Sequence, residues 1–189
     1  MERSFETVLV AQCAPTLAGV KPASLFRWRD ARGGETAREA AAHWGRELAP
    51  FGIAVRILKT CPRTGDSLIY LYRAGWLRKI LTEPANLGFL ARMGYALDQG
   101  CSGLLEQLSA RLCLERAFPH EIGVFLGYPL EDVVGFIENQ GRNYTCCGYW
   151  KAYGDPAEAR HRFAQYRRCT EVCRRRFQMG VPVVRLVAA

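Results

Sequence analysis

Cys13 and His120 are the side chains whose types and places in the sequence best suit nucleophilic catalysis. Cys13 stands directly before an expected helix whose first turn contains Pro15. Unpaired amides and the helix dipole at such a position favour the thiolate. A cysteine nucleophile needs a base within hydrogen-bond reach, and His120 begins an expected strand. The sequence therefore predicts Cys13 as the nucleophile and His120 as the base of a cysteine-dependent hydrolase or acyltransferase.

A third polar group would have to orient the His120 imidazole. Glu121, Asp132 and Asn143 are available in the sequence, and Asp132 is the candidate that we assign. The competing interpretation needs no chemistry, because a small cysteine is often buried and a histidine can cap the end of a strand. The distance between Cys13 and His120 in the fold is the observation that decides between them.

A run of arginines near the C-terminus offers a different chemistry. The window 160–176 contains seven arginines against the single acidic residue Glu171 and carries much of the net charge of +8. Such a surface attracts nucleic acid, an anionic membrane or an acidic protein. It could equally be the solvated side of an amphipathic helix. The candidate anion- or partner-binding residues are Arg167, Arg168, Arg174, Arg175 and Arg176.

The eight cysteines do not follow a metal-binding pattern, because the sequence has no Cys-x-x-Cys and no pair of histidines at ligand spacing. Cys146 and Cys147 are adjacent and would point to opposite faces of a strand. Cys169 and Cys173 share one face of an expected helix, where core packing explains them. The sequence predicts no metal site and leaves any cofactor unidentified.

Length and composition bound the setting. A chain of 189 residues with 49% hydrophobic content can bury one substantial core, so we expect a single domain over residues 1–189. No run of eighteen uncharged apolar residues predicts a membrane span, and the first residues lack the layout of a secretory signal. We therefore expect a cytoplasmic protein with reduced thiols.

The hydrophobic patterning predicts an α+β fold in which a mostly antiparallel sheet of about four or five strands is packed by helices. A first helix is expected from near Pro15, ended or restarted by Pro22 just before residues 23–28, and a flexible break follows at 30–34. The further expected helices cover residues 36–49, most of 74–117, 129–139 and a basic segment from 155. The expected strands cover residues 53–58 and 67–72 as an antiparallel pair, then 121–126, 146–153 and 181–187.

Two long motifs carry a resemblance to a known family. Residues 13–21 and 118–137, followed by the aromatic segment 148–153, resemble a clostridial family known only as domain of unknown function 3793. The likeness extends over nearly the whole chain. It implies iron or redox physiology, because genes of that family lie near flavodoxin or iron-uptake genes, and it implies no catalytic residues.

A second, local resemblance concerns residues 120–127, which are similar to the histidine strand of papain-like peptidoglycan peptidases. There the histidine partners a cysteine that begins a helix, which implies the same roles for His120 and Cys13. Gln12 departs from that family's pattern, because an acidic residue usually precedes the cysteine. The separation of Cys13 and His120 is also much longer than in those enzymes, so wall hydrolysis is not expected.

The sequence thus favours a ligand-binding or accessory protein in iron or redox metabolism, possessing a redox or iron-related partner. A thiol-dependent hydrolase or transferase that uses Cys13 and His120 is the alternative. A basic adaptor for nucleic acid or an acidic protein is a third interpretation, and nucleic acid is the less favoured partner because no zinc-finger spacing or RNA-recognition signature is present.

Overall fold

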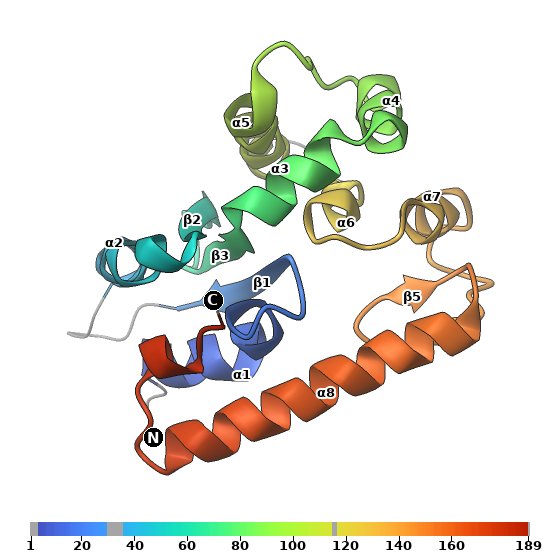
Figure 1. The fold of residues 1–189 in the computed structure, drawn as a ribbon. Helices are drawn as coiled ribbons and strands as arrows, with labels where there is room; N and C mark the ends of the chain where they lie inside the picture. The colour runs from blue at the N-terminus through green and yellow to red at the C-terminus, as the bar shows by residue number, and fades with distance from the viewer. Residues whose placement is uncertain (1–3, 30–35, 115–116, 189) are drawn as a thin grey trace. The chain divides into compact units, whose positions relative to one another are not determined.

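The computed structural model describes residues 4–29, 36–114 and 117–188. The chain forms two compact units: unit 1 joins Met1–Gly75 to Tyr166–Ala189, and unit 2 is Trp76–Gln165. The long helix α8 (Pro156–Gln178) contributes residues to both units. Helices and antiparallel strands occur together, which confirms the predicted α+β class (Figure 1). One domain over residues 1–189 stays a prediction.

A three-stranded antiparallel sheet organises unit 1. The central strand β3 (Ser67–Arg73) pairs with β1 (Ala23–Trp28) on one side and with β2 (Ile53–Thr60) on the other. The predicted antiparallel pair of β2 and β3 is therefore confirmed. In Figure 1, α1 (Phe5–Leu17) lies beside β1 and α2 (Ala37–Leu48) lies beside β2. A short 3-10 helix, η1 (Ala49–Phe51), connects α2 to β2.

The core of unit 1 lies between these helices and the sheet. Ile69 and Leu71 point to one face of β3 and are fully buried in a cluster with Leu9 of α1 and Trp44 of α2. Tyr70, on the opposite face, is also fully buried. Because β3 is covered on both faces, its sequence is a nearly continuous apolar run and does not alternate between polar and apolar residues.

The first helix begins ten residues earlier than the sequence predicts, so its expected start near Pro15 is wrong. Helix α1 begins at Phe5 behind the N-cap Ser4, whose hydroxyl accepts a hydrogen bond from the Thr7 amide at 3.3 Å. Pro15 occupies the last turn instead of the first. Burial of Leu9, Cys13 and Leu17 along one helical face explains why the helix continues through the proline.

The segment after Pro22 is the strand β1, and its expected helical character is wrong. Its partner β3 lies more than forty residues further along the chain, as the pairing of Ala23 with Tyr72 shows. A local pattern does not contain that partner. The predicted flexible break at 30–34 falls outside the described residues.

The predicted second helix is confirmed as α2, which begins with a capping box. The hydroxyl of Thr36 accepts a hydrogen bond from the Glu39 amide at 3.2 Å, and the Glu39 carboxylate accepts one from the Thr36 amide at 3.0 Å. These reciprocal bonds satisfy two amide groups that the helix itself leaves unpaired.

Unit 2 is mostly helical, and this confirms the predicted helical region after residue 74. Its helices are most of α3 (Ala74–Thr82), α4 (Pro84–Arg92), α5 (Gly100–Leu114), α6 (Ile122–Phe125), α7 (Leu130–Glu138) and the start of α8. A small hairpin, β4 (Cys146–Cys147) and β5 (Lys151–Ala152), completes it. The carboxylate of Asp155 accepts a hydrogen bond from the Ala157 amide at 2.7 Å, as expected for the start of the basic helix.

Three strand predictions differ from the structure. Residues 121–126 contain α6 rather than a strand. The sequence prediction failed because all six residues are buried, and such a run lacks the periodicity that separates a helix from a strand. The expected strand at 146–153 is broken into the hairpin of β4 and β5. Residues 181–187 contain the 3-10 helix η2 (Val183–Leu186), which begins after Pro182. The described strands number five, in sheets of three and two rather than in one sheet.

Candidate functional site

An open groove with a volume of about 380 Å³ lies in unit 1, between α8 and the C-terminal segment that contains η2. Its polar lining consists of Arg168, Cys169, Cys173, Arg176 and Arg185. We call it the thiol–arginine groove. It brings two cysteines and three arginines to one surface of unit 1.

The arginines reach the groove from two elements. Arg168 and Arg176 are eight residues apart on α8 and therefore share a face of the helix, whereas Arg185 comes from η2. All three side chains are exposed, and none forms an ion pair with a residue that the structure describes. Three arginines that form no ion pair among the described residues, placed around one concave surface, create a positive potential that attracts an anion.

The walls between these charges are apolar. Val172, Leu186 and Val187 line the groove, and Leu186 is anchored in the core of unit 1. The amide of Ala188 donates a hydrogen bond to the Leu17 carbonyl oxygen at 3.1 Å, which fixes the C-terminal segment beside the end of α1. The position of Arg185 therefore depends on packing as well as on its own exposed side chain.

The two thiols of the groove interact with each other. Cys169 and Cys173 are four residues apart on α8 and share one face of the helix. The Cys169 thiol donates a hydrogen bond to the Ala14 carbonyl oxygen at 3.6 Å. The interaction with Cys169 and the nearby charge of Arg176 lower the pKa of Cys173, and the interaction with Cys173 and burial raise the pKa of Cys169. Of the two, Cys173 is the group that ionises first.

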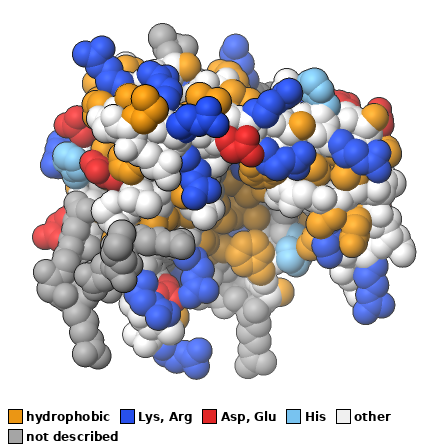
Figure 2. All heavy atoms as spheres, turned by 90° about the horizontal axis from the view of Figure 1, so that it is seen from below, with side chains coloured by type: hydrophobic (Ala, Val, Ile, Leu, Met, Phe, Trp, Pro, Cys, Tyr) orange, Lys and Arg blue, Asp and Glu red, His pale blue; other side chains and the backbone are white. Residues whose placement is uncertain are grey.

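The five predicted basic residues have different surroundings. Arg168 and Arg176 line the thiol–arginine groove, and Arg174 lines a second groove of unit 1 between α1 and α8. Arg167 and Arg175 are exposed and line neither. Lys and Arg side chains are also spread widely over the face shown in Figure 2. Positive charge alone therefore does not single out a site, whereas the convergence of Arg168, Arg176 and Arg185 with two thiols on one groove does.

Cys13 lies in the core and has no exposed surface. Burial raises the pKa of its thiol to about 12, although the charge of Lys21 and a hydrogen bond with Ser24 lower it. Because α1 begins at Phe5, the thiol does not face the unpaired amides of a helix start, and that premise of the catalytic prediction is wrong. These surroundings are those of a neutral packing residue.

His120 lies in unit 2, in the turn before α6. Its exposed ring packs against two aromatic rings, with centroid distances of 5.7 Å to Phe118 and 4.8 Å to Phe136. The expectation that His120 begins a strand is wrong. The structure does not bring His120 and Cys13 together within either unit. Their catalytic pairing stays a prediction, which the burial of Cys13 weighs against.

Asp132, the predicted orienting group, is buried at the start of α7. Its carboxylate accepts hydrogen bonds from the Trp150 indole N–H at 2.7 Å, the Tyr153 amide at 2.6 Å and the Gly154 amide at 2.9 Å. These bonds connect α7 to the segment that contains β5. The described hydrogen bonds of Asp132 are thus those of a structural anchor, and its role beside an imidazole stays a prediction.

Cys61 is a candidate reactive thiol that the sequence did not single out. It begins the loop between β2 and β3, and hydrogen bonds from the Thr64 hydroxyl and from the Thr64 and Arg63 amides lower its pKa to about 7. In the sequence, the spacing of Cys61 and Thr64 across a turn that contains a proline could have indicated this hydrogen bond to the thiol. The thiolate is the nucleophilic form of cysteine.

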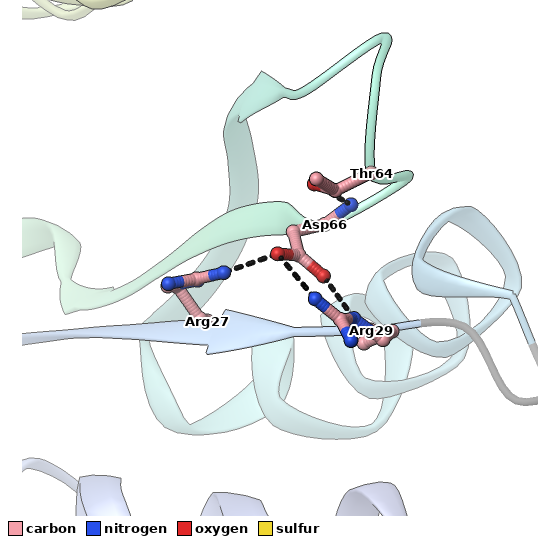
Figure 3. A network of polar contacts seen from close by, with 4 residues as sticks. All are labelled: Arg27, Arg29, Thr64 and Asp66. Carbon is pink, nitrogen blue, oxygen red and sulfur yellow. Dashed lines mark hydrogen bonds and ion pairs between the residues drawn. The ribbon is translucent and has the colours of Figure 1, made fainter.

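The loop that carries Cys61 is held by a charge cluster (Figure 3). Asp66 accepts hydrogen bonds from Arg29 at 2.6 and 3.1 Å and from Arg27, and its amide donates to the Thr64 hydroxyl at 3.3 Å. These guanidinium groups, Arg29 first and then Arg27, hold the pKa of the Asp66 carboxyl far below its usual range. The Asp66 carboxylate therefore remains charged throughout the neutral pH range and fixes the loop through Arg27 and Arg29, while the Asp66 amide contacts Thr64.

Alkylation of the native protein with iodoacetamide should therefore modify Cys61 faster at pH 7 than the exposed Cys147. Thr64→Val removes the hydroxyl donor. The alkylation rate of Cys61 should therefore fall at pH 7, and the increase of this rate with pH should occur at higher pH. Peptide mass spectrometry at a series of pH values measures both rates. Unchanged alkylation of Cys61 in the Thr64→Val protein would contradict this account of the thiolate.

The described ranges, residues 4–29, 36–114 and 117–188, were compared with what a metal site and a membrane span require. No group of three or more His, Cys, Asp and Glu side chains is placed there to hold a metal ion. None of the helices within those ranges has both the length and the apolar character that a membrane span requires.

Comparison with known families gives one match. The sequence profile described as "Protein of unknown function (DUF3793)" matches residues 9–187, which is nearly the whole chain. Comparison with curated proteins and with solved structures finds no match. The matched region includes residues 9–17 of α1, most of both units and the thiol–arginine groove up to Val187. The chain therefore belongs to the DUF3793 family, whose function is unknown.

Proposed function

We propose that this protein binds a small organic anion in the thiol–arginine groove. The observation that carries the proposal is the convergence of Arg168, Arg176 and Arg185 on one groove, without ion pairs to described residues. Guanidinium groups bind carboxylate, phosphate and sulfonate oxygens through charge-assisted hydrogen bonds. The groove offers such donors from two separate elements, so an anion that enters it is contacted from two sides.

The size and lining of the groove favour a small molecule over a polymer. Its volume of about 380 Å³ lies within the range of small-molecule pockets. Val172, Leu186 and Val187 supply apolar walls, so the ligand that suits it has an apolar part beside its anionic group. A nucleic acid would instead need an extended basic track with stacking aromatic rings.

The biological setting that we propose is that of a cytoplasmic ligand-binding or accessory protein in iron or redox metabolism. The family resemblance supports this setting, and the pair of thiols in the groove is compatible with it. The alternative of a hydrolase that uses Cys13 has weaker support, because that thiol is buried and its pKa is raised to about 12.

The test uses 8-anilinonaphthalene-1-sulfonate, which combines a sulfonate with aromatic rings, and pyrophosphate as a competitor without an apolar part. We expect Arg168→Gln, Arg176→Gln and Arg185→Gln each to weaken binding of the sulfonate about tenfold, because each removes one charge-assisted contact. Fluorescence titration measures the affinity. Pyrophosphate should displace the sulfonate from the wild-type protein.

Arg175→Gln is the matched control, since it makes the same charge change on α8 outside the groove. Its affinity should stay within about twofold of the wild-type value, as a distant surface charge is screened at physiological salt. Equal weakening by all four variants would indicate diffuse attraction to a basic surface and would overturn the proposal. Tighter, steeply salt-dependent binding of single-stranded nucleic acid would favour the adaptor interpretation instead.

A further inference from the structure

We propose that Cys169 and Cys173 form a two-thiolate binding site for a soft monovalent metal ion, with Cu(I) as the ion to be tested. The two residues are one helical turn apart on α8, so their side chains lie on one face of the helix, and both line the thiol–arginine groove. The sulfurs are therefore paired and also reachable from solvent. This inference goes beyond the proposed anion site and does not depend on it.

The spacing of the two cysteines along α8 allows both sulfurs to bind the same metal ion. Metal–sulfur bonds of about 2.3 Å hold two sulfurs no more than roughly 4.6 Å apart. Cβ atoms of residues four apart on a helix are about 5–6 Å apart, so side-chain rotations alone bring the Cys169 and Cys173 sulfurs within that span around one ion. The helix backbone does not need to move.

The same helical spacing disfavours a disulfide. Residues four apart on a helix have Cβ atoms about 5–6 Å apart. A disulfide brings its Cβ atoms to about 3.5–4.5 Å. Oxidation of Cys169 and Cys173 to a disulfide would therefore distort α8, whereas metal binding would not. The pair is better suited to hold an ion than to act as a redox switch.

The number of donors selects the kind of metal. Structural zinc sites use four protein ligands, and iron–sulfur clusters are commonly held by four cysteines. No third His, Cys, Asp or Glu of the described chain joins Cys169 and Cys173 in such a group. Thiolate pairs are soft ligands that select Cu(I), and a monovalent closed-shell ion is satisfied by two of them.

The charge of the groove matches the charge of the complex. Two thiols and one Cu(I) ion give a bis-thiolate complex of charge −1 and release two protons, with no change of oxidation state. One fewer proton is released when Cys173 is already ionised. Arg168, Arg176 and Arg185 surround the complex and compensate its negative charge. Hard divalent ions gain nothing from this setting, because they prefer oxygen ligands.

The experiment titrates the reduced, metal-free protein anaerobically with Cu(I) buffered by bicinchoninate. We expect about one Cu(I) ion per chain to be held against this competitor and X-ray absorption at the copper edge to show two sulfur ligands. Cys169→Ser and Cys173→Ser should each lose that ion. Cys147→Ser, which changes an exposed cysteine of unit 2, should retain it.

Cys173 is buried, so its variant could lose Cu(I) through misfolding. A second measurement therefore uses the wild-type protein: Cu(I) should protect Cys169 and Cys173 from iodoacetamide and leave Cys147 reactive. Equal protection of all three thiols, or copper ligands other than two sulfurs, would overturn the site. Cys169→Ser should lose Cu(I) but retain the aromatic sulfonate, because it leaves all three arginines of the groove in place, so failure of the metal site and failure of the anion site are distinguishable.

Discussion

Asp132→Ala should destabilise the protein by about 3 kcal/mol, because hydrogen bonds to charged groups contribute roughly 1.5–3 kcal/mol each and buried partners would be left unsatisfied. The buried carboxylate accepts three hydrogen bonds, from the Trp150 indole and from the amides of Tyr153 and Gly154. Alanine accepts none of them. Urea unfolding, followed by fluorescence and circular dichroism, measures the change in the free energy of unfolding.

Asp132→Asn separates shape from charge at this position. The amide has one acceptor oxygen and presents its NH₂ group to a donor, so we expect a smaller loss of about 1–2 kcal/mol. Glu131→Gln is the matched control, because Glu131 is the exposed neighbour of Asp132 in the same helical turn. It should change stability by no more than about 0.5 kcal/mol. A loss in Asp132→Ala no larger than in this control would show that water replaces the carboxylate.

Local chemistry made several elements predictable from the sequence. The turn-rich segment between residues 60 and 67 joins β2 and β3, both rich in branched and aromatic residues, and the expected antiparallel pair is present. Asp155 and Pro156 mark the start of α8 as expected. In each case the decisive information is a cap, a turn or a short-range pairing.

The wrong predictions share a different physical cause. Strand β1 exists because it pairs with β3, far along the chain, and the helical signal around Pro15 and Pro22 says nothing of that partner. Helix α6 is buried on all sides, which removes the polar positions that would reveal its period. Close packing also shapes the segment: a Cβ atom at Gly123 would lie 2.7 Å from Val133 of α7. Such tertiary contacts override local preference.

The candidate site was only partly visible in the sequence. The arginine run of α8 was evident, but only helical phase and the C-terminal segment show that Arg168 and Arg176 share a groove with Arg185. The sequence also showed that Cys169 and Cys173 share one helical face. Core packing was the explanation given for them, and both thiols do pack in or against the core cluster of unit 1. Their place in the groove depends on η2, which the sequence suggested as a strand. A groove that is formed by two segments far apart in the sequence can be recognised only once the fold is known.

Arg73→Met should also destabilise the protein by about 3 kcal/mol, since it removes charge-assisted hydrogen bonds from a buried guanidinium and leaves its carbonyl acceptors unpaired. Arg73 donates to the carbonyl oxygens of Thr16 at 2.8 Å, Leu17 at 2.7 Å and Ala188 at 2.9 Å. The first two end α1, where the helix dipole favours a positive charge. Burial lowers the pKa of Arg73, but arginine remains charged at neutral pH.

Arg73 also supports the thiol–arginine groove, because Ala188 lies in the groove wall and is held by the guanidinium. Arg73→Met should therefore weaken binding of the aromatic sulfonate as well as stability, although Arg73 does not line the groove. Arg73→Lys keeps the charge but not the planar fork of donors, so it should lose an intermediate amount, about 1–2 kcal/mol. Arg46→Met on the exposed side of α2 is the matched control and should change neither property. Loss of stability without loss of sulfonate affinity would show that the C-terminal wall is held without Arg73, by the packing of Val183 and Leu186 and the hydrogen bond of the Ala188 amide.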